Sequence, residues 1–158
     1  MTTNADPISI CSVHDGWGDL PPRKRWKWGW VAVDLVDARV VAIATAHEIG
    51  GESDIAVVRS VYTTRPGDRL GRRLLAAGRD ELAAADPPII LYRSGMATPA
   101  DDAACRAVEL PLLPPKAREL ESRGIPYIPY SVEDATEVGK LHLAQAARFL
   151  GLQAAQAS

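Results

Sequence analysis

Apolar and polar residues alternate along much of the first half of the chain, from residue 26 to residue 63. A period of two is typical of β-strands, whose successive side chains point to opposite faces. Turn-forming residues interrupt this pattern twice. The pattern therefore predicts an antiparallel meander of three strands, with the middle strand covered on both faces. The strands are expected at 26–35, 40–49 and 54–63, and the turns at 36–39 and 50–53.

The first of these strands carries Trp26, Trp28 and Trp30 at alternate positions, which would place them on one face. With the basic residues beside them, they would suit base stacking in a protein that binds single-stranded nucleic acid. We expect instead that they cover a core or a contact with a second subunit. The net charge of −2 argues against a general attraction to phosphates.

The spacing of apolar residues becomes helical after Pro66. Proline, glycine and capping residues mark where the helices begin and end. Helices are expected at 70–85, 98–110, 116–124 and 131–151, with a short strand at 89–92 and an extended segment at 125–130. The apolar stripe of the last helix comprises Val132, Ala135, Val138, His142, Ala146 and Phe149. We expect His142 to be packed, with this helix docked on the sheet or on a second subunit.

The pattern divides the 158 residues into three parts. Residues 1–24 are interpreted as an irregular lead-in, because they include a run dense in glycine, proline and charge. Residues 25–130 are expected to form the main α+β domain. Residues 131–158 would supply a final helix and a tail that frays.

The composition favours a soluble cytoplasmic protein. Hydrophobic residues make up 47% of the chain, which is enough for a sizeable core. No apolar run is long enough to span a bilayer, and the N-terminal segment lacks the pattern of a signal peptide. Cys11 and Cys105 have no ligand-type spacing to each other, and no second pair completes a zinc site with Cys11 and His14. We therefore expect neither a disulfide framework nor a metal site.

The segment RPGDRLGRRLL, residues 65–75, places four arginines around the start of a helix. The helix dipole disfavours positive charge at that end. The N–H groups of a helix start, beside a glycine, can form a cradle for an anion. A bound anion would offset the unfavourable charge, so we hypothesise a phosphate-binding loop. The alternative is a basic turn beside a surface helix.

The order of three strands, a basic loop, a helix, a strand and a helix resembles that of the GNAT superfamily of N-acyltransferases. The segment SVYTTRPGDRLGRRLLAAG, residues 60–78, is similar to the family's strand, phosphate-binding loop and helix. The resemblance extends over residues 26–110. It implies an α+β fold with a mixed, mostly antiparallel central sheet and helices on both faces. It also implies acetyl-CoA as a cosubstrate.

The resemblance also assigns residues to a site. Val61 would face the thioester through its backbone N–H, as a cofactor contact and as a catalytic donor to the developing oxyanion. Ser94 would meet the pantetheine arm. In this sequence Arg69 stands where the family has a glycine, and Gly67 is displaced from that position. The residues that would hold the diphosphate are Arg69, Leu70, Gly71, Arg72 and Arg73.

Acyl transfer to an amine requires a base, and many family members also supply a tyrosine as acid. Four residues flank the second hairpin, His47, Glu48, Glu52 and Asp54. Glu48 is the preferred base, and the alternative is a solvated hairpin carboxylate. We expect His47 and Glu48 to point to opposite faces, so that only one faces the cleft. The tyrosine position is taken by Cys105 or by Leu120, and Cys105 is expected to be a core residue.

Two functions remain open at this stage. The leading hypothesis is an acetyl-CoA-dependent N-acyltransferase that transfers an acetyl group to an amine of a small molecule or a protein. The alternative is a non-catalytic GNAT-like interaction or assembly module, which the arginine at position 69, the missing tyrosine and the short lead-in favour. A homodimer could form through the tryptophan strand or the C-terminal helix. Neither a membrane nor a nucleic acid is expected as a partner.

Overall fold

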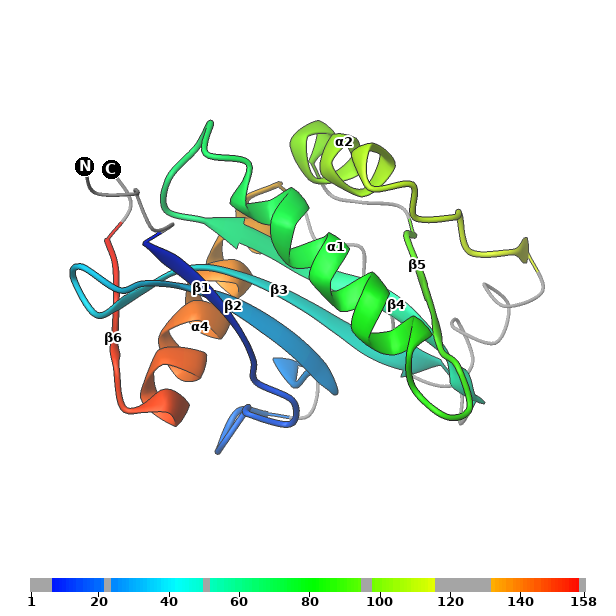
Figure 1. Cartoon of the computed structure of the whole chain (residues 1–158), viewed down its shortest axis with the longest axis horizontal. Helices are drawn as coiled ribbons and strands as arrows, with labels where there is room; N and C mark the ends of the chain where they lie inside the picture. Colours follow the sequence, from blue (N-terminus) through cyan, green and yellow to red (C-terminus); the bar gives the residue numbers. More distant parts are fainter. Residues whose placement is uncertain (1–6, 22–23, 50–51, 95–97, 116–131, 157–158) are drawn as a thin grey trace, which may run out of the picture.

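A curled, mostly antiparallel sheet forms the centre of the protein (Figure 1). The computed structural model describes residues 7–21, 24–49, 52–94, 98–115 and 132–156. In the described part the strand order is β1-β2-β3-β4-β5, with β6 beside β3. The strands are β1 (Ile8–Ser12), β2 (Trp28–Asp34), β3 (Arg39–Ile49), β4 (Glu52–Thr63), β5 (Ile90–Tyr92) and β6 (Gln153–Ala154).

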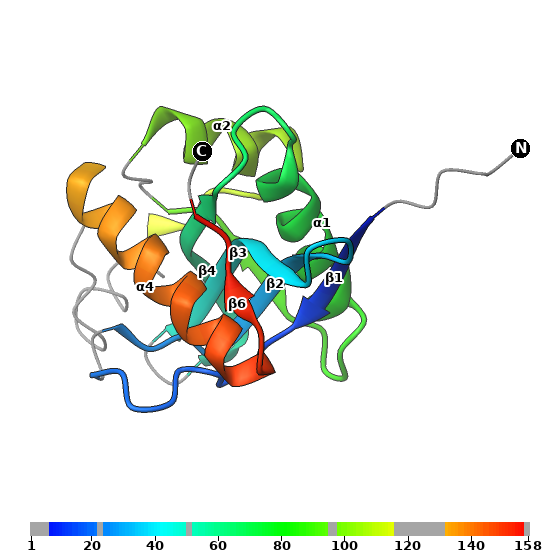
Figure 2. The same ribbon diagram turned by 90° about the vertical axis from the view of Figure 1, so that its left-hand side faces the viewer.

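Helices cover both faces of this sheet (Figure 2). Helix α1 (Leu70–Ala83) lies against one face and contributes Leu74 and Leu75 to the core there. Helix α2 (Pro99–Ala107) packs beside α1. Helix α4 (Val132–Leu150) lies against the other face, over β3 and β4. The α+β fold class expected from the sequence is therefore confirmed, with its mostly antiparallel sheet and helices on both faces. The helix predicted at 116–124 and the extended segment at 125–130 lie outside the described residues.

The predicted meander is present as the antiparallel strands β2, β3 and β4. The fourth predicted strand, β5, pairs in parallel with β4, from Ile55 opposite Ile90 to Val57 opposite Tyr92. A parallel pair needs a crossover connection, which α1 supplies. The sheet is thus antiparallel from β1 to β4 and becomes parallel at its β5 edge, and the short strand β6 also pairs in parallel, with β3.

The chain before residue 25 differs from the predicted irregular lead-in. β1 pairs along its whole length with β2, from Ile8 opposite Asp34 to Ser12 opposite Trp30. Its residues Ile8 and Ile10 pack against the core on the α1 face. The alternation of ISICS is only five residues long, and the glycine- and proline-rich loop that follows it dominates the composition of this region.

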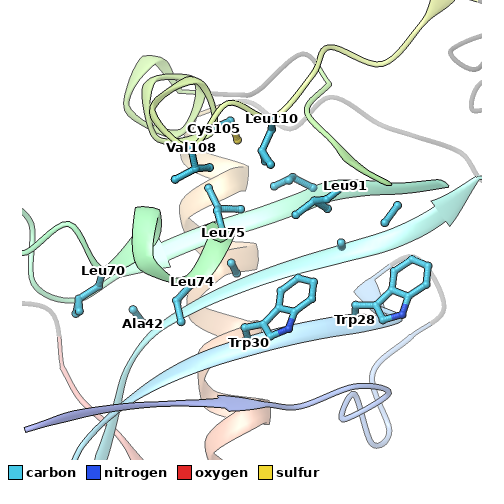
Figure 3. Close-up of a cluster of buried hydrophobic side chains, with 14 of the residues drawn as sticks. Trp28, Trp30, Ala42, Leu70, Leu74, Leu75, Leu91, Cys105, Val108 and Leu110 are labelled. Atoms are coloured by element: carbon cyan, nitrogen blue, oxygen red, sulfur yellow. The ribbon is translucent and has the colours of Figure 1, made fainter. Parts of the chain in front are cut away.

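The three tryptophans do not share one face. Trp28 and Trp30 project from β2 toward the side that α1 covers, and they are 8% and 2% exposed (Figure 3). Trp26 precedes β2 and packs in the core on the opposite face. Its Nε1 donates to the carbonyl of Val13 at 2.8 Å. A Cβ at Gly29 would lie 2.7 Å from that Nε1, so a glycine is needed where the indole crosses the strand. All three side chains are core residues, and none is exposed enough to stack on bases or to form a contact with a second subunit.

Part of the tail that was expected to fray instead pairs with the sheet. β6 pairs in parallel with Arg39 and Val40 of β3, and Ala155 N donates to the carbonyl of Val40 at 2.8 Å. The pairing of β3 with β4 ends at Ala42 opposite Thr63. The edge of β3 beyond that point would be left open, and the tail covers it.

The last helix docks on the sheet, and three residues of the predicted stripe face it. Val138, His142 and Ala146 are buried, but Phe149 is 55% exposed. The buried face instead continues through Leu143 and Ala147. A helix has 3.6 residues per turn, so a stripe read as steps of three and four residues drifts off the buried face. The ring of Phe149 lies against Gly16, where an added Cβ would be 3.3 Å from it.

Candidate functional site

The residue at the start of α1 has a backbone conformation that is typical of glycine. Arg69 is the N-cap of α1, with φ 56° and ψ 25°, which is the left-handed region. Residues other than glycine rarely adopt this backbone conformation. Arg69 therefore has a backbone geometry that glycine usually supplies. No side chain caps α1 at this end, and its first turn has no acidic residue.

The loop before α1 is not filled by its own side chains. Residues 66–69 are exposed. Gly67 has φ 93°, and a Cβ added there would meet nothing within 4 Å. Leu70 is 2% exposed and belongs to the core, so only its backbone could contact a ligand. Both observations fit an anion bound by N–H groups at the helix start.

The four arginines of this segment have different surroundings. Arg65 forms an ion pair with Asp34, and its guanidinium also lies 3.7 Å from Asp37. The hydrogen bond from Arg65 is the main cause that lowers the pKa of Asp34. Arg69 and Arg72 are exposed, and Arg73 is half-buried. Arg65 thus anchors the loop to the β2–β3 turn, and the other three surround the start of α1.

The structure brings Gly71 and Val61 together. A Cβ at Gly71 would lie 3.0 Å from Cγ1 of Val61, so the glycine allows α1 to approach β4 closely. Val61 is half-buried and packs against the core on the α1 face. Helix packing alone therefore accounts for Gly71, whereas the open position at Gly67 has no packing role.

The two parallel strands part before β4 ends. β5 pairs with β4 only as far as Val57, but β4 continues to Thr63. In the described part of the chain, residues 58–63 have no partner on the β5 side. Thr45 lies opposite Ser60 and Ala46 opposite Val58, so Arg59 is the extra residue of a β-bulge. Bulges re-aim side chains and are common next to active sites.

A pocket of about 370 Å³ lies beside this bulge. Positively charged, negatively charged and aromatic side chains all line it. Its lining residues are Asp15, Trp17, Arg25, Trp26, Lys27, His47, Glu48 and Arg59. This size is within the range of small-molecule sites.

His47 and Glu48 both line this pocket, which differs from their expected separation on opposite faces. The register of β3 against β4 shifts on both sides of the pair, so strict alternation does not hold here. Glu48 accepts a hydrogen bond from Lys27 Nζ at 2.9 Å, and both side chains are partly exposed. His47 is 5% exposed. Burial, and secondarily the charge of Arg59, lowers the pKa of His47 to about 3, so its imidazole is neutral at neutral pH.

Ser94 and Cys105 are both buried on the β5 side of the molecule. Ser94 follows β5 and is 5% exposed. Cys105 of α2 has no exposed surface, which confirms that it is a core residue. Burial, followed by the charges of Asp101 and Asp102, raises the pKa of the Cys105 thiol to about 12. A thiol of this kind is a poor proton donor near neutral pH.

A buried polar network next to the bulge was not predicted. Nε2 of His142 lies 2.7 Å from the carbonyl oxygen of Lys24, which only accepts, so Nε2 carries the proton. Nδ1 then accepts from the hydroxyl of Ser60 at 2.8 Å, and Ser60 lies 2.6 Å from the hydroxyl of Thr45. Burial lowers the pKa of His142 to about 4. The sequence placed His142 on a packed stripe, but nothing in it indicated these partners.

Apart from Ser94, the predicted site residues thus fall into two groups. The residues from Arg69 to Arg73 lie past the C-terminal end of β4, where Val61 approaches Gly71. Glu48 lies on β3 opposite Ala56, three residues before the bulge. Roughly 13 Å of strand separates Arg59 from Thr63, at about 3.3 Å per residue. The structure therefore leaves the proposed base apart from the proposed anion site, with the unpaired edge of β4 between them.

Within the described ranges, no three or more His, Cys, Asp or Glu residues are grouped so that they could hold a metal ion. None of the described helices is both long and apolar enough to cross a membrane. No family model, curated protein or solved structure matches the chain.

Proposed function

We propose that the protein is an N-acyltransferase that uses acetyl-CoA. The observation that carries this proposal is the course of β4. This strand separates from β5 after Val57 and then leads, through an open loop, into a helix start without a side-chain cap. An extended ligand with a diphosphate at one end and a thioester at the other would suit both features.

The diphosphate would bind at the start of α1. N–H groups of the first helical turn and the guanidinium groups of Arg69, Arg72 and Arg73 supply donors and positive charge. The left-handed backbone at Arg69 and the open space at Gly67 leave room for close approach. A diphosphate bound there would offset the unfavourable interaction between these arginines and the helix dipole.

The pantetheine arm would follow the β4 edge that β5 leaves unpaired. Main-chain N–H and C=O groups of residues 58–63 on that side would bond to its amides, as a neighbouring strand does. The backbone N–H of Val61 would donate to the thioester oxygen as negative charge develops. Ser94, which follows β5, would lie on the opposite side of the arm.

Acetyl transfer would then take place beside the bulge. The nitrogen of a neutral amine attacks the thioester carbonyl, the C–N bond forms and the C–S bond breaks. The amine loses one proton, and the departing thiolate gains one from solvent. Glu48 would accept the amine proton, directly or through water. Its contact with Lys27 is partly exposed, so a substrate could compete for it.

The alternative is a domain of the same shape that binds without catalysis. The burial of Cys105 favours it, because this candidate acid for the thiolate lies in the core. A catalyst that lacks a protein acid can release thiolate to water, so the missing acid lowers the rate and does not forbid the reaction. The two functions differ in whether CoA is produced.

Release of CoA thiol from acetyl-CoA tests this function directly. We expect thiol release that depends on an added primary amine and falls about 100-fold in Glu48→Gln, since a positioned base contributes at least that much. The matched control is Glu137→Gln, an exposed carboxylate on α4, with unchanged release. Tight binding of acetyl-CoA without any amine-dependent release would support the non-catalytic alternative.

A further inference from the structure

We infer that the pocket at the β4 bulge binds a small zwitterion, a primary amine that also carries a carboxylate, as an amino acid does. Its role as the acetyl acceptor rests on the proposed function. The binding site itself rests on the pocket alone, which brings both signs of charge together in about 370 Å³.

Among the described residues, the pocket wall carries both signs of charge. Arg25, Lys27 and Arg59 are its cations, and Asp15 and Glu48 are its carboxylates. Lys27 and Glu48 pair with each other at 2.9 Å. A ligand that carries one group of each sign can therefore meet an opposite charge at both of its ends.

Arg25 is held in a position suited to a carboxylate. Its guanidinium carbon lies 4.0 Å from the centroid of the Trp17 ring, and its Nε donates to the carbonyl of Leu20 at 2.8 Å. These contacts fix the plane of the group. A fixed guanidinium presents paired N–H donors that match the two oxygens of a carboxylate.

Arg59 reaches the same pocket because of the bulge. It is the extra residue between Val58 and Ser60, and a bulge turns such a side chain away from regular alternation. His47 beside it is buried and lowers the polarity of the wall without adding a charge. A carboxylate near both arginines would thus be bound in surroundings that strengthen charge-assisted hydrogen bonds.

The carboxylates supply the other half of the recognition. Glu48 and Asp15 line the same pocket, and an ammonium group is their natural partner. The Lys27–Glu48 pair is 41% and 38% exposed, and such pairs are weak enough for a ligand ammonium to compete. The same carboxylate would then remove the proton that acetylation requires. A simple amine, or a lysine of a protein, would fill this half and would supply no carboxylate to the guanidinium of Arg25.

Calorimetric titration of the full chain without acetyl-CoA tests the inference. The probes are the standard L-amino acids, followed by the decarboxylated amine and the deaminated acid of the tightest binder. We expect the amino acid to bind at least about 10-fold more tightly than either analogue, since each analogue loses charge-assisted hydrogen bonds. An amine analogue that binds as tightly as its parent, or a panel with no binder, would overturn the inference.

Two variants assign the two halves of the pocket. Arg25→Gln should weaken the amino acid about 10-fold and leave the amine analogue unchanged. Glu48→Gln should weaken the amino acid and the amine, and leave the deaminated acid unchanged. Arg148→Gln, on the exposed side of α4, is the control and should change nothing. Circular dichroism verifies that each variant is folded. Unchanged affinities in both pocket variants would remove these residues from the site.

The outcomes separate this inference from the proposed function. If acetyl-CoA binds and simple amines are acetylated while no amino acid binds, the zwitterion site is wrong and the acyltransferase stands. If amino acids bind and acetyl-CoA does not, the zwitterion site stands and its role as an acceptor site is lost.

Discussion

The two faces of the sheet are packed by different chemistry. On the α1 face, Trp28, Trp30, Leu74 and Leu75 make an almost entirely apolar core (Figure 3). On the α4 face, apolar packing alternates with buried polar side chains, of which His142 is fully buried. The bulge and the polar pocket adjoin the second of these regions.

This difference separates the parts of the molecule that stabilise the fold from those that can recognise a ligand. A close-packed apolar core has few groups that titrate, and it leaves no room for a ligand among its side chains. A buried network is costly unless every member is bonded, and it fixes one arrangement of its partners. His142 joins α4 to β4 beside the bulge in this way. We therefore expect substitutions on the two faces to differ in size and in pH dependence.

Removal of an aromatic side chain on the α1 face should have the largest effect. Trp30→Ala is expected to lower the free energy of unfolding by about 4 kcal/mol, because it leaves a cavity in a close-packed core. The indole does not ionise, and its hydrogen-bond partner Glu81 has a lowered pKa and stays ionised at both pH values, so this cost should be nearly the same at pH 7 and pH 5. Urea-induced unfolding followed by circular dichroism measures both values.

Val36→Ala is the control, since Val36 is 81% exposed in the β2–β3 turn and should contribute little. A cost below 1 kcal/mol for Trp30→Ala would contradict the placement of this indole in the core.

His142→Ala should have the next largest effect at neutral pH. It removes the group that bonds to Ser60 and to the Lys24 carbonyl, and it also leaves a cavity. We expect a loss of about 3 kcal/mol at pH 7 from these two costs together. Lys140→Ala, on the exposed side of the same helix, should cost less than about 0.5 kcal/mol. Equal stability of the two variants would show that the network does not hold α4.

The stability of the wild type should fall as pH decreases from 7 to 5. Burial lowers the pKa of His142 from 6.5 to about 4, so the unfolded chain binds a proton in this range and the folded chain does not. The stabilisation is complete above pH 6.5 and is lost as pH falls toward 4. We expect His142 to contribute roughly 2 kcal/mol of the loss between pH 7 and pH 5.

His47 shifts in the same direction, so part of the fall should remain in His142→Ala. The cost of that substitution should accordingly shrink at pH 5, while the cost of Trp30→Ala should not. A pH dependence that is identical in wild type and His142→Ala would contradict the buried neutral imidazole.

The smallest predicted effect concerns the backbone at Arg69. Arg69→Gly relieves a left-handed conformation but increases the entropy of the unfolded chain, so a net change within about 1 kcal/mol is expected. Arg69→Ala removes the same charge and keeps the unfavourable conformation, so it should be the less stable of the two. Their unfolding midpoints in urea give the difference. A less stable Arg69→Gly would contradict the left-handed geometry.

Much of the fold could be predicted because strong periodic patterns determine it. The meander, α1, β5 and the capped start of α2 follow from alternation, helical spacing and a threonine before a proline. β1 and β6 could not be predicted in the same way. Each is short, and each is stabilised by an edge of the sheet that another part of the chain provides. Such pairing is a long-range property that local sequence does not carry.

The candidate site could be predicted only in part, for a related reason. The loop before α1 consists of residues that are adjacent in the sequence, so the sequence predicts them as one group. The pocket joins Arg25 and Lys27 to Glu48 and Arg59, and this grouping depends on strand register and on a bulge. The prediction for Trp26 was wrong because this residue precedes the strand, so strand alternation does not apply to it. Its indole passes over β2 at Gly29, where no side chain blocks it.

Calorimetric titration with acetyl-CoA tests most directly whether the start of α1 holds a diphosphate. We predict that the wild type binds acetyl-CoA and that Arg72→Ala/Arg73→Ala binds it at least about 10-fold more weakly, because charge-assisted contacts are lost. Lys140→Ala/Arg148→Ala makes the same change of charge on α4 and should bind as the wild type does. Absence of binding to the wild type, or equal binding to both double variants, would contradict the account.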